Sequence, residues 1–194
     1  MKVVTVLTLN LSSVGQLTDE AFYNLCRTNP DLKFECTEDG KLIIVSPTGG
    51  ETGIRNRRIT QRLGNWTDED NSGVSFDSST CFKLPSGAKR SPDAAWIILE
   101  RWESLTPEQR QKFPPLAPDF VIELRSPTDE LDSLQAKMRE YMSNGVRLGW
   151  LIDPILRRVE VYRLGEEVEV LESPSSLSGE DVLPGFVLDL DRIL

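Results

Sequence analysis

The feature of this sequence that most restricts its fold is the alternation of short apolar runs with two long segments of helical periodicity. In residues 51–67 apolar positions recur every three to four residues, and residues 131–144 repeat this pattern before Gly145, a residue type that commonly ends helices. Strand pairs combined with two substantial helices predict an α/β (α+β) domain with a central mixed β-sheet flanked by helices. The strand-like runs are 32–37, 41–46, 74–76, 81–84, 94–99, 120–122, 148–152, 157–162, 167–171 and 186–190.

The beginning of the chain predicts a helix followed by a hairpin. Thr18 is a suitable helix cap, and Asn29-Pro30 ends the helix that it begins. The first two strand-like runs are separated by a turn containing Asp39-Gly40, where glycine supplies the positive φ of a tight turn. The opening run 3–11 is apolar but far shorter than the ~20 residues needed to span a bilayer. We therefore expect an initial strand or a loose arm there, and no membrane segment.

The length and the cysteines bound the organisation of the chain. Its 194 residues, 39% of them hydrophobic, are enough for one core without disulfides, and no repeat or linker divides them. We therefore treat 1–194 as a single domain. Cys26, Cys36 and Cys81 show no C-x-x-C spacing and are too few for a four-thiolate zinc site, so buried thiols are expected. Their odd number and the lack of a signal peptide favour a cytoplasmic protein.

The complete absence of histidine excludes many kinds of active site. Ser-His-Asp and Cys-His nucleophile systems, histidine-containing zinc sites and a histidine general base all require the imidazole. Proton transfer would have to use carboxylates, lysine, tyrosine, cysteine or water. The 22 basic and 31 acidic residues give a formal charge of −9, which argues against a protein that coats nucleic acid, although a local basic patch remains open.

Two acidic residues stand at the ends of apolar strand-like runs. Asp93 follows Pro92 and opens one run, and Glu123 closes the run that begins at Phe120. Either residue alone could be a hydrogen-bonded strand-end acid or half of a surface ion pair. Two carboxylates converging at the rim of a sheet are costly to desolvate unless a cation meets them. The pair therefore predicts a site for a hard metal ion on neighbouring strands.

Two further charged residues could join this site. Lys137 lies beside the apolar stripe formed by Leu134, Met138 and Tyr141, so its ammonium could reach the sheet edge where Glu123 ends. The alternative is a lysine on a solvated helix face. Glu51 opens the helix 51–67, where an acid is also favoured by the helix dipole alone.

A set of motifs resembles a known family. Pro92-Asp93, the segment 121–127, Lys137 with Tyr141, and the segment 149–154 together look like the Uma-two family of bacterial restriction-endonuclease-like proteins. The resemblance extends from Leu17 to Phe186. It implies a PD-(D/E)XK nuclease core with magnesium held by acids. In that pattern Asp93 matches the motif aspartate, Glu123 matches the (D/E) position, and Glu51 resembles the first-helix acid of the metal shell.

The sequence departs from the simple nuclease motif at one position. Arg125 stands where that motif has lysine, and arginine stays protonated, although it can hold a phosphate. The resemblance implies that Lys137 supplies the lysine from the following helix. Arg55 and Arg125 are the expected substrate-binding residues. The basic residues expected to rim the site are Arg55, Arg58, Lys89 and Arg90.

These observations lead to a functional expectation with two alternatives. We expect a magnesium- or manganese-dependent DNA endonuclease in which Asp93, Glu123 and Lys137 are catalytic and Glu51 joins both acids at the metal. The alternatives are an inactive module with the same fold, or an acid-lined enzyme of another phosphoryl-transfer class.

The alternating valines of the C-terminal third suggest strands that cover the core or form a homodimer contact. These valines are Val159, Val161, Val168 and Val170.

Overall fold

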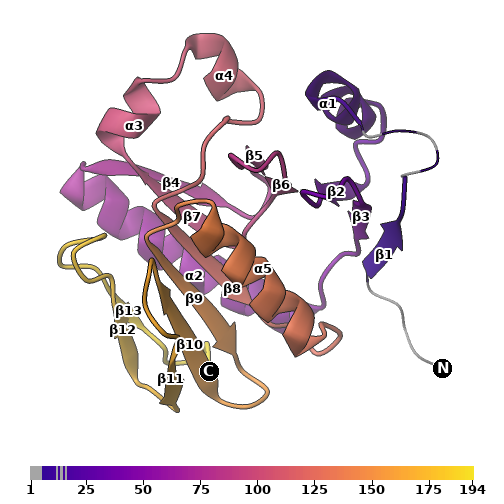
Figure 1. The fold of residues 1–194 in the computed structure, drawn as a ribbon. Coiled ribbons are helices and arrows are strands. Elements are labelled where there is room, and N and C mark those ends of the chain that lie inside the picture. Colours follow the sequence, from indigo (N-terminus) through magenta and orange to yellow (C-terminus); the bar gives the residue numbers. More distant parts are fainter. Residues whose placement is uncertain (1–5, 12, 14, 16) are drawn as a thin grey trace.

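The computed structural model describes residues 6–11, 13, 15 and 17–194, and its centre is a six-stranded mixed sheet (Figure 1). The strand order is β11-β10-β9-β8-β7-β4, with β8 and β9 parallel and the other neighbours antiparallel. The prediction of a mixed sheet flanked by helices is confirmed. The strands are β4 (Gly73–Asp77), β7 (Ala94–Ile98), β8 (Phe120–Leu124), β9 (Leu148–Asp153), β10 (Arg158–Arg163) and β11 (Glu169–Glu172).

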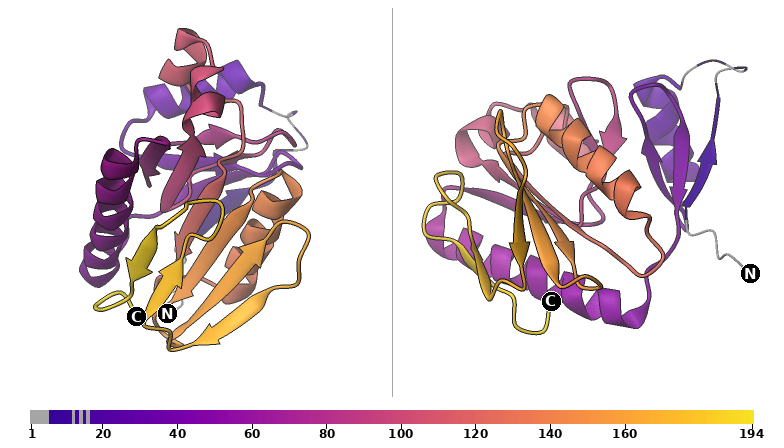
Figure 2. Two further views of the ribbon diagram at one scale, coloured as in Figure 1. Left: turned by 90° about the vertical axis from the view of Figure 1, so that its left-hand side faces the viewer. Right: turned by 60° about the horizontal axis from the view of Figure 1, so that its bottom comes forward.

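Helices α2 (Gly50–Asp70) and α5 (Leu131–Ser143) cover opposite faces of this sheet (Figure 2). On one face Ile59 and Leu63 of α2 pack in the cluster that contains Trp96 and Trp150. On the other face Met138 and Tyr141 of α5 join a cluster with strand residues of the opposite parity. Helix α5 also makes the crossover that parallel strands require, since it connects β8 to β9.

A smaller sheet stands beside the main one, with strand order β1-β3-β2-β6-β5. The predicted hairpin is present, with Gly40 at φ +80° in its turn. Phe22 of α1 (Asp19–Thr28) packs on this sheet against Phe34 and Leu42. The chain enters the main sheet from β6 through Ser91, Pro92 and Asp93. The strands are β1 (Val6–Leu9), β2 (Lys33–Cys36), β3 (Leu42–Val45), β5 (Phe82–Lys83) and β6 (Lys89–Arg90).

Several boundaries differ from those predicted. The run 81–84 contributes only β5 and belongs to the smaller sheet, and the run 186–190 pairs outside both sheets. Helix α2 continues to Asp70, because Asn71 adopts the left-handed conformation (φ 58°) that commonly ends a helix. In the described part of the chain, no helix combines the length and hydropathy needed to cross a membrane. The remaining elements are α3 (Leu99–Glu103), α4 (Pro107–Gln111), β12 (Ser176–Ser178) and β13 (Val187–Asp189).

Gly73 at the start of β4 should be intolerant of a side chain. A Cβ there would lie 2.4 Å from the Ile97 carbonyl oxygen and equally close to the Trp96 ring. We expect Gly73→Ala to lower the free energy of unfolding by about 1–3 kcal/mol through overpacking. Gly64→Ala in α2 is the control, since its Cβ would meet nothing within 4 Å and it should stabilise by about 0.5–1 kcal/mol. Urea denaturation measures both, and equal stability of the two variants would contradict this packing.

Candidate active site

The register of β7 and β8 brings Asp93 and Glu123 to the same edge of the main sheet. Ala94, the first residue of β7, is the cross-strand partner of Ile122, so Asp93 immediately precedes β7 at the edge where Glu123 lies in β8. The backbone N–H of Leu124 donates to Asp93 Oδ2 at 2.8 Å, which ties the two strand ends together. Glu123 is 4% exposed and Asp93 is partly buried. The prediction that these two strands are neighbours is confirmed.

Two side chains of helix α5, Lys137 and Tyr141, contact Glu123. Lys137 Nζ lies 2.8 Å from Glu123 Oε1, and the Tyr141 hydroxyl donates to the same oxygen at 2.9 Å. The two side chains share a helix face because they are four residues apart. The structure therefore places Lys137 on the sheet side of α5, with its side chain 14% exposed, and not on a solvated face.

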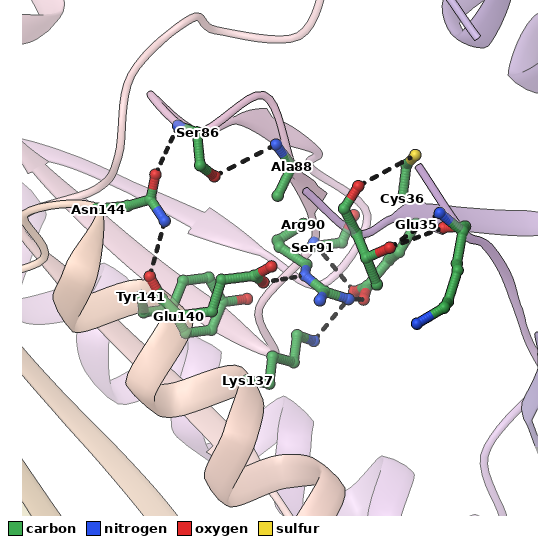
Figure 3. Close-up of polar contacts among 12 residues, drawn as sticks. Glu35, Cys36, Ser86, Ala88, Arg90, Ser91, Lys137, Glu140, Tyr141 and Asn144 are labelled. Carbon is green, nitrogen blue, oxygen red and sulfur yellow. Dashed lines mark hydrogen bonds and ion pairs between the residues drawn. The ribbon is translucent and has the colours of Figure 1, made fainter. Parts of the chain in front are cut away.

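A third carboxylate, Glu35 of β2, meets the same lysine (Figure 3). Its Oε1 lies 3.0 Å from Lys137 Nζ and accepts from the Ser91 N–H at 3.1 Å, while Oε2 accepts from Arg90 at 3.0 Å. Sequence reasoning missed Glu35. A charged residue between two apolar strand residues is the ordinary pattern of a half-solvated strand, and no local signal shows that this face meets α5.

The two glutamates in contact with Lys137 have pKa values that are shifted in opposite directions. For Glu35, burial acts to raise the pKa, but Lys137 and Arg90 outweigh it and lower the pKa to about 2. For Glu123, burial raises the pKa to about 7 despite the neighbouring Lys137. Burial also raises the pKa of Asp93. Burial opposes the charge of Lys137, but Glu123 and Glu35 raise its pKa above the ordinary value, so the lysine is an ammonium at neutral pH.

The donor set at Asp93 and Glu123 suits a hard divalent cation. Asn56 of α2 donates from Nδ2 to Asp93 Oδ1 at 3.0 Å, and its own Oδ1 is buried with no hydrogen-bond partner among the described residues. A buried, unpaired amide oxygen in a side chain that contacts the Asp93 carboxylate is a costly arrangement without a cation. Magnesium often uses one or two protein carboxylates and takes its other ligands from water and substrate phosphate. The residues present therefore fit the expected ion.

Glu51 does not join the two acids in a common ligand group. Within the described residues no cluster of three or more Asp, Glu, Cys or His side chains is arranged to hold a metal ion. The Glu51 side chain is 84% exposed and its carboxylate lies 3.7 Å from Arg55. It lines the same cavity as Asp93 and Glu123. At the first turn of α2 its side chain is exposed to solvent, so a part for Glu51 at the metal stays a prediction.

The arginines expected to bind substrate have partners within the protein. Arg125 lies 2.8 Å from the buried carboxylate of Asp153, and Arg55 donates to the Ile193 carbonyl at 3.0 Å. Neither lines the cavity onto which Asp93 opens. The other residues of the expected basic rim are also engaged: Arg58 with the Arg192 carbonyl, Lys89 with Asp19, and Arg90 with Glu35 and Glu140.

The cavity of about 1820 Å³ in front of Asp93 and Glu123 is lined by residues of the smaller sheet, the start of α2 and helix α5. Ten acidic and four basic side chains are among its described lining residues. The four basic residues are Lys33, Arg90, Lys137 and Arg139. This excess of acids disfavours a polyanion unless cations enter with it.

Comparisons with known proteins agree with this architecture. A family model described as "Uma2: Putative restriction endonuclease" matches residues 19–191. A solved structure titled as a putative nuclease belonging to DUF820 from Anabaena variabilis ATCC 29413 superposes with a TM-score of 0.68 and 21% sequence identity. The match covers 82% of this chain and 88% of that one. At that identity the likeness shows a shared fold. No curated protein sequence matches the chain.

Proposed function

Because the chain belongs to the Uma2 family, whose description is "Putative restriction endonuclease", we propose that it is a metal-dependent nuclease that hydrolyses DNA phosphodiester bonds. The observation that carries this proposal is the Lys137 ammonium 2.8 Å from Glu123, with Asp93 bound to the neighbouring Leu124 N–H at 2.8 Å. Phosphodiester hydrolysis needs a positioned water, neutralisation of the phosphoryl charge and help for the leaving group. A buried lysine in contact with Glu123, near a second carboxylate that could share a cation, would meet these needs without histidine.

Each residue of the cluster has a defined part in this proposal. Asp93 and Glu123 would hold magnesium or manganese, which when bound neutralises phosphoryl charge and activates water. The Leu124 N–H and Asn56 fix Asp93, and Tyr141 fixes Glu123. Lys137, kept charged by its two glutamates, would donate a hydrogen bond to the charge that develops on the phosphoryl oxygens. Arg125 and Arg55 would contribute to substrate binding only after leaving their present partners.

Incubation of the purified chain with supercoiled and single-stranded DNA tests this activity. We expect cleavage with Mg²⁺ or Mn²⁺ and none in a chelator, because Asp93 and Glu123 without an ion present only negative charge to the phosphate. No cleavage of either DNA at an ion concentration that raises the melting temperature would contradict the proposal.

The acidic lining of the cavity favours one alternative function, an interaction module that keeps the fold without catalysis. Lys33, Arg90, Lys137 and Arg139 are outnumbered there by acids. Such a module would neither cleave DNA nor be stabilised by divalent ions. The same incubation combined with thermal melting therefore separates the two functions.

We also propose that the protein forms a homodimer through the edge strand β11. Val159 and Val161 of β10 are buried in the core, but Val168 and Val170 are 41% and 48% exposed. Sedimentation at micromolar concentration is expected to show a species of twice the 21.8 kDa chain mass. A Val170→Lys substitution should shift it to the monomer, since a desolvated charge opposes association. A wild-type protein that sediments only as a monomer would contradict this contact.

A further inference from the structure

Glu35 reaches the candidate active site from a different sheet than Asp93 and Glu123. It belongs to β2 of the smaller sheet and is 4% exposed. Its carboxylate accepts from three donors on two elements: Arg90 of β6, the N–H of Ser91 just after β6, and Lys137 of α5. A buried carboxylate with three donors is held in place on every side.

The Glu35 carboxylate has two donors besides Lys137, the Arg90 guanidinium and the Ser91 N–H. Arg90 is 8% exposed at its side chain and contacts Glu140 of α5 as well as Glu35 (Figure 3). Arg90 and Ser91 lie three and two residues before Asp93, so the donors that hold Glu35 and the proposed metal ligand belong to one continuous segment. Lys137 contacts Glu35 and Glu123, whereas Arg90 contacts Glu35 and Glu140.

Lys137 is shared between an anchored glutamate and a glutamate that the proposed function assigns to a metal ion. Its Nζ lies 3.0 Å from Glu35 and 2.8 Å from Glu123. A divalent cation on Glu123 would compete for that carboxylate and repel the ammonium. Glu35 would then be the remaining acid in contact with Lys137.

We infer that Glu35 is a positioning residue that holds Lys137 beside the scissile phosphate while Glu123 binds the ion. The inference deepens the proposed function and rests on it. Glu35 touches neither substrate nor ion and acts through the lysine. The competing interpretation is that Glu35 only joins the smaller sheet to α5, as a buried ion pair with no part in turnover.

A double-mutant cycle separates these interpretations. Cleavage kinetics with Mn²⁺ are measured for the wild type, Glu35→Gln, Lys137→Met and the double variant. We expect Glu35→Gln to lower kcat about 10- to 100-fold with KM nearly unchanged, as for residues that orient a catalytic group. The double variant should be no slower than Lys137→Met, because Glu35 acts through Lys137. Losses that multiply in the double variant would overturn the inference.

Glu160 provides a matched control. It is also 4% exposed and also contacts α5, where Gln135 donates to it at 2.7 Å, but it has no contact with Lys137. Glu160→Gln should change kcat by less than about twofold, since no catalytic group depends on it. If Glu160→Gln slows cleavage as much as Glu35→Gln, loss of a buried carboxylate on α5 explains both results and the inference fails.

The test also distinguishes a folding defect from a loss of function, and failure of this inference from failure of the proposed function. If Glu35→Gln does not fold, Glu35→Asp replaces it in the cycle, because aspartate keeps the charge for Arg90 but shortens the reach toward Lys137. A wild-type kcat in the aspartate variant would overturn the inference. A wild-type protein that cleaves no DNA overturns the proposed function and this inference together, whereas an active wild type with a multiplicative cycle overturns the inference alone.

Discussion

Replacing Lys137 with alanine is expected to slow DNA cleavage by about 10²- to 10⁴-fold, the range typical of a lost proton-transfer or charge-stabilising group. Lys137 is the cation in contact with Glu123, at 2.8 Å, and it lines the cavity in which the phosphate would lie. Alanine removes the ammonium but leaves Asp93 and Glu123 in place. Stabilisation by Mn²⁺ should therefore persist while turnover is lost. Cleavage kinetics and thermal melting on the same preparation measure the two effects separately.

A surface lysine serves as the control for this prediction. Lys112 pairs with Glu108 at the end of α4 and its side chain is 52% exposed, so Lys112→Ala should leave the cleavage rate unchanged. Lys137→Met keeps most of the stem that packs beside Tyr141, which guards against a loss that reflects poor folding alone. Cleavage at the wild-type rate by Lys137→Ala would show that Arg125 or another residue supplies the catalytic ammonium or guanidinium.

Asp93→Asn is expected to abolish both cleavage and the thermal shift caused by Mn²⁺. A ligand at 100 times its Kd stabilises the folded state by about 2.7 kcal/mol, which corresponds to about 5–10 °C for a chain of this size. The amide is a weaker ligand than the carboxylate because it is uncharged. The metal-free variant should still fold, since its oxygen can accept from the Leu124 N–H and its new amide group can donate to the unpaired Asn56 Oδ1 after that side chain turns over.

Asp119 at the opposite end of β8 is the control for Asp93. It is 2% exposed and accepts from the Ile98 N–H at 2.9 Å and from Arg101 at 2.8 Å. Asp119→Asn should lower the melting temperature in the absence of metal, because the buried carboxylate loses its ion pair with the partly exposed Arg101, and leave the Mn²⁺-induced shift intact. A full shift in Asp93→Asn would place the ion elsewhere.

The elements of the main sheet follow from local pattern. Residues 120–124 and 148–153 are continuous apolar strands apart from Glu123 and Asp153, and the structure buries both on two faces. The periodicity of 131–144 predicts α5 within one residue of its observed end. The predicted bounds of shorter strands agree less well with the structure. A strand of two residues such as β5 is defined by its pairing and not by its composition.

Local sequence patterns predict the fold class, the longer helices and strands, and the placement of Asp93 and Glu123 at strand ends, since periodicity is a local property. Which charges meet depends on tertiary packing. Glu35 reaches Lys137 across 102 positions of sequence, and Arg55 reaches Ile193 across 138. Such contacts depend on how two sheets and a helix pack. A buried charge must be paired wherever it comes to lie, but its partner is whichever opposite charge the fold brings within about 3 Å.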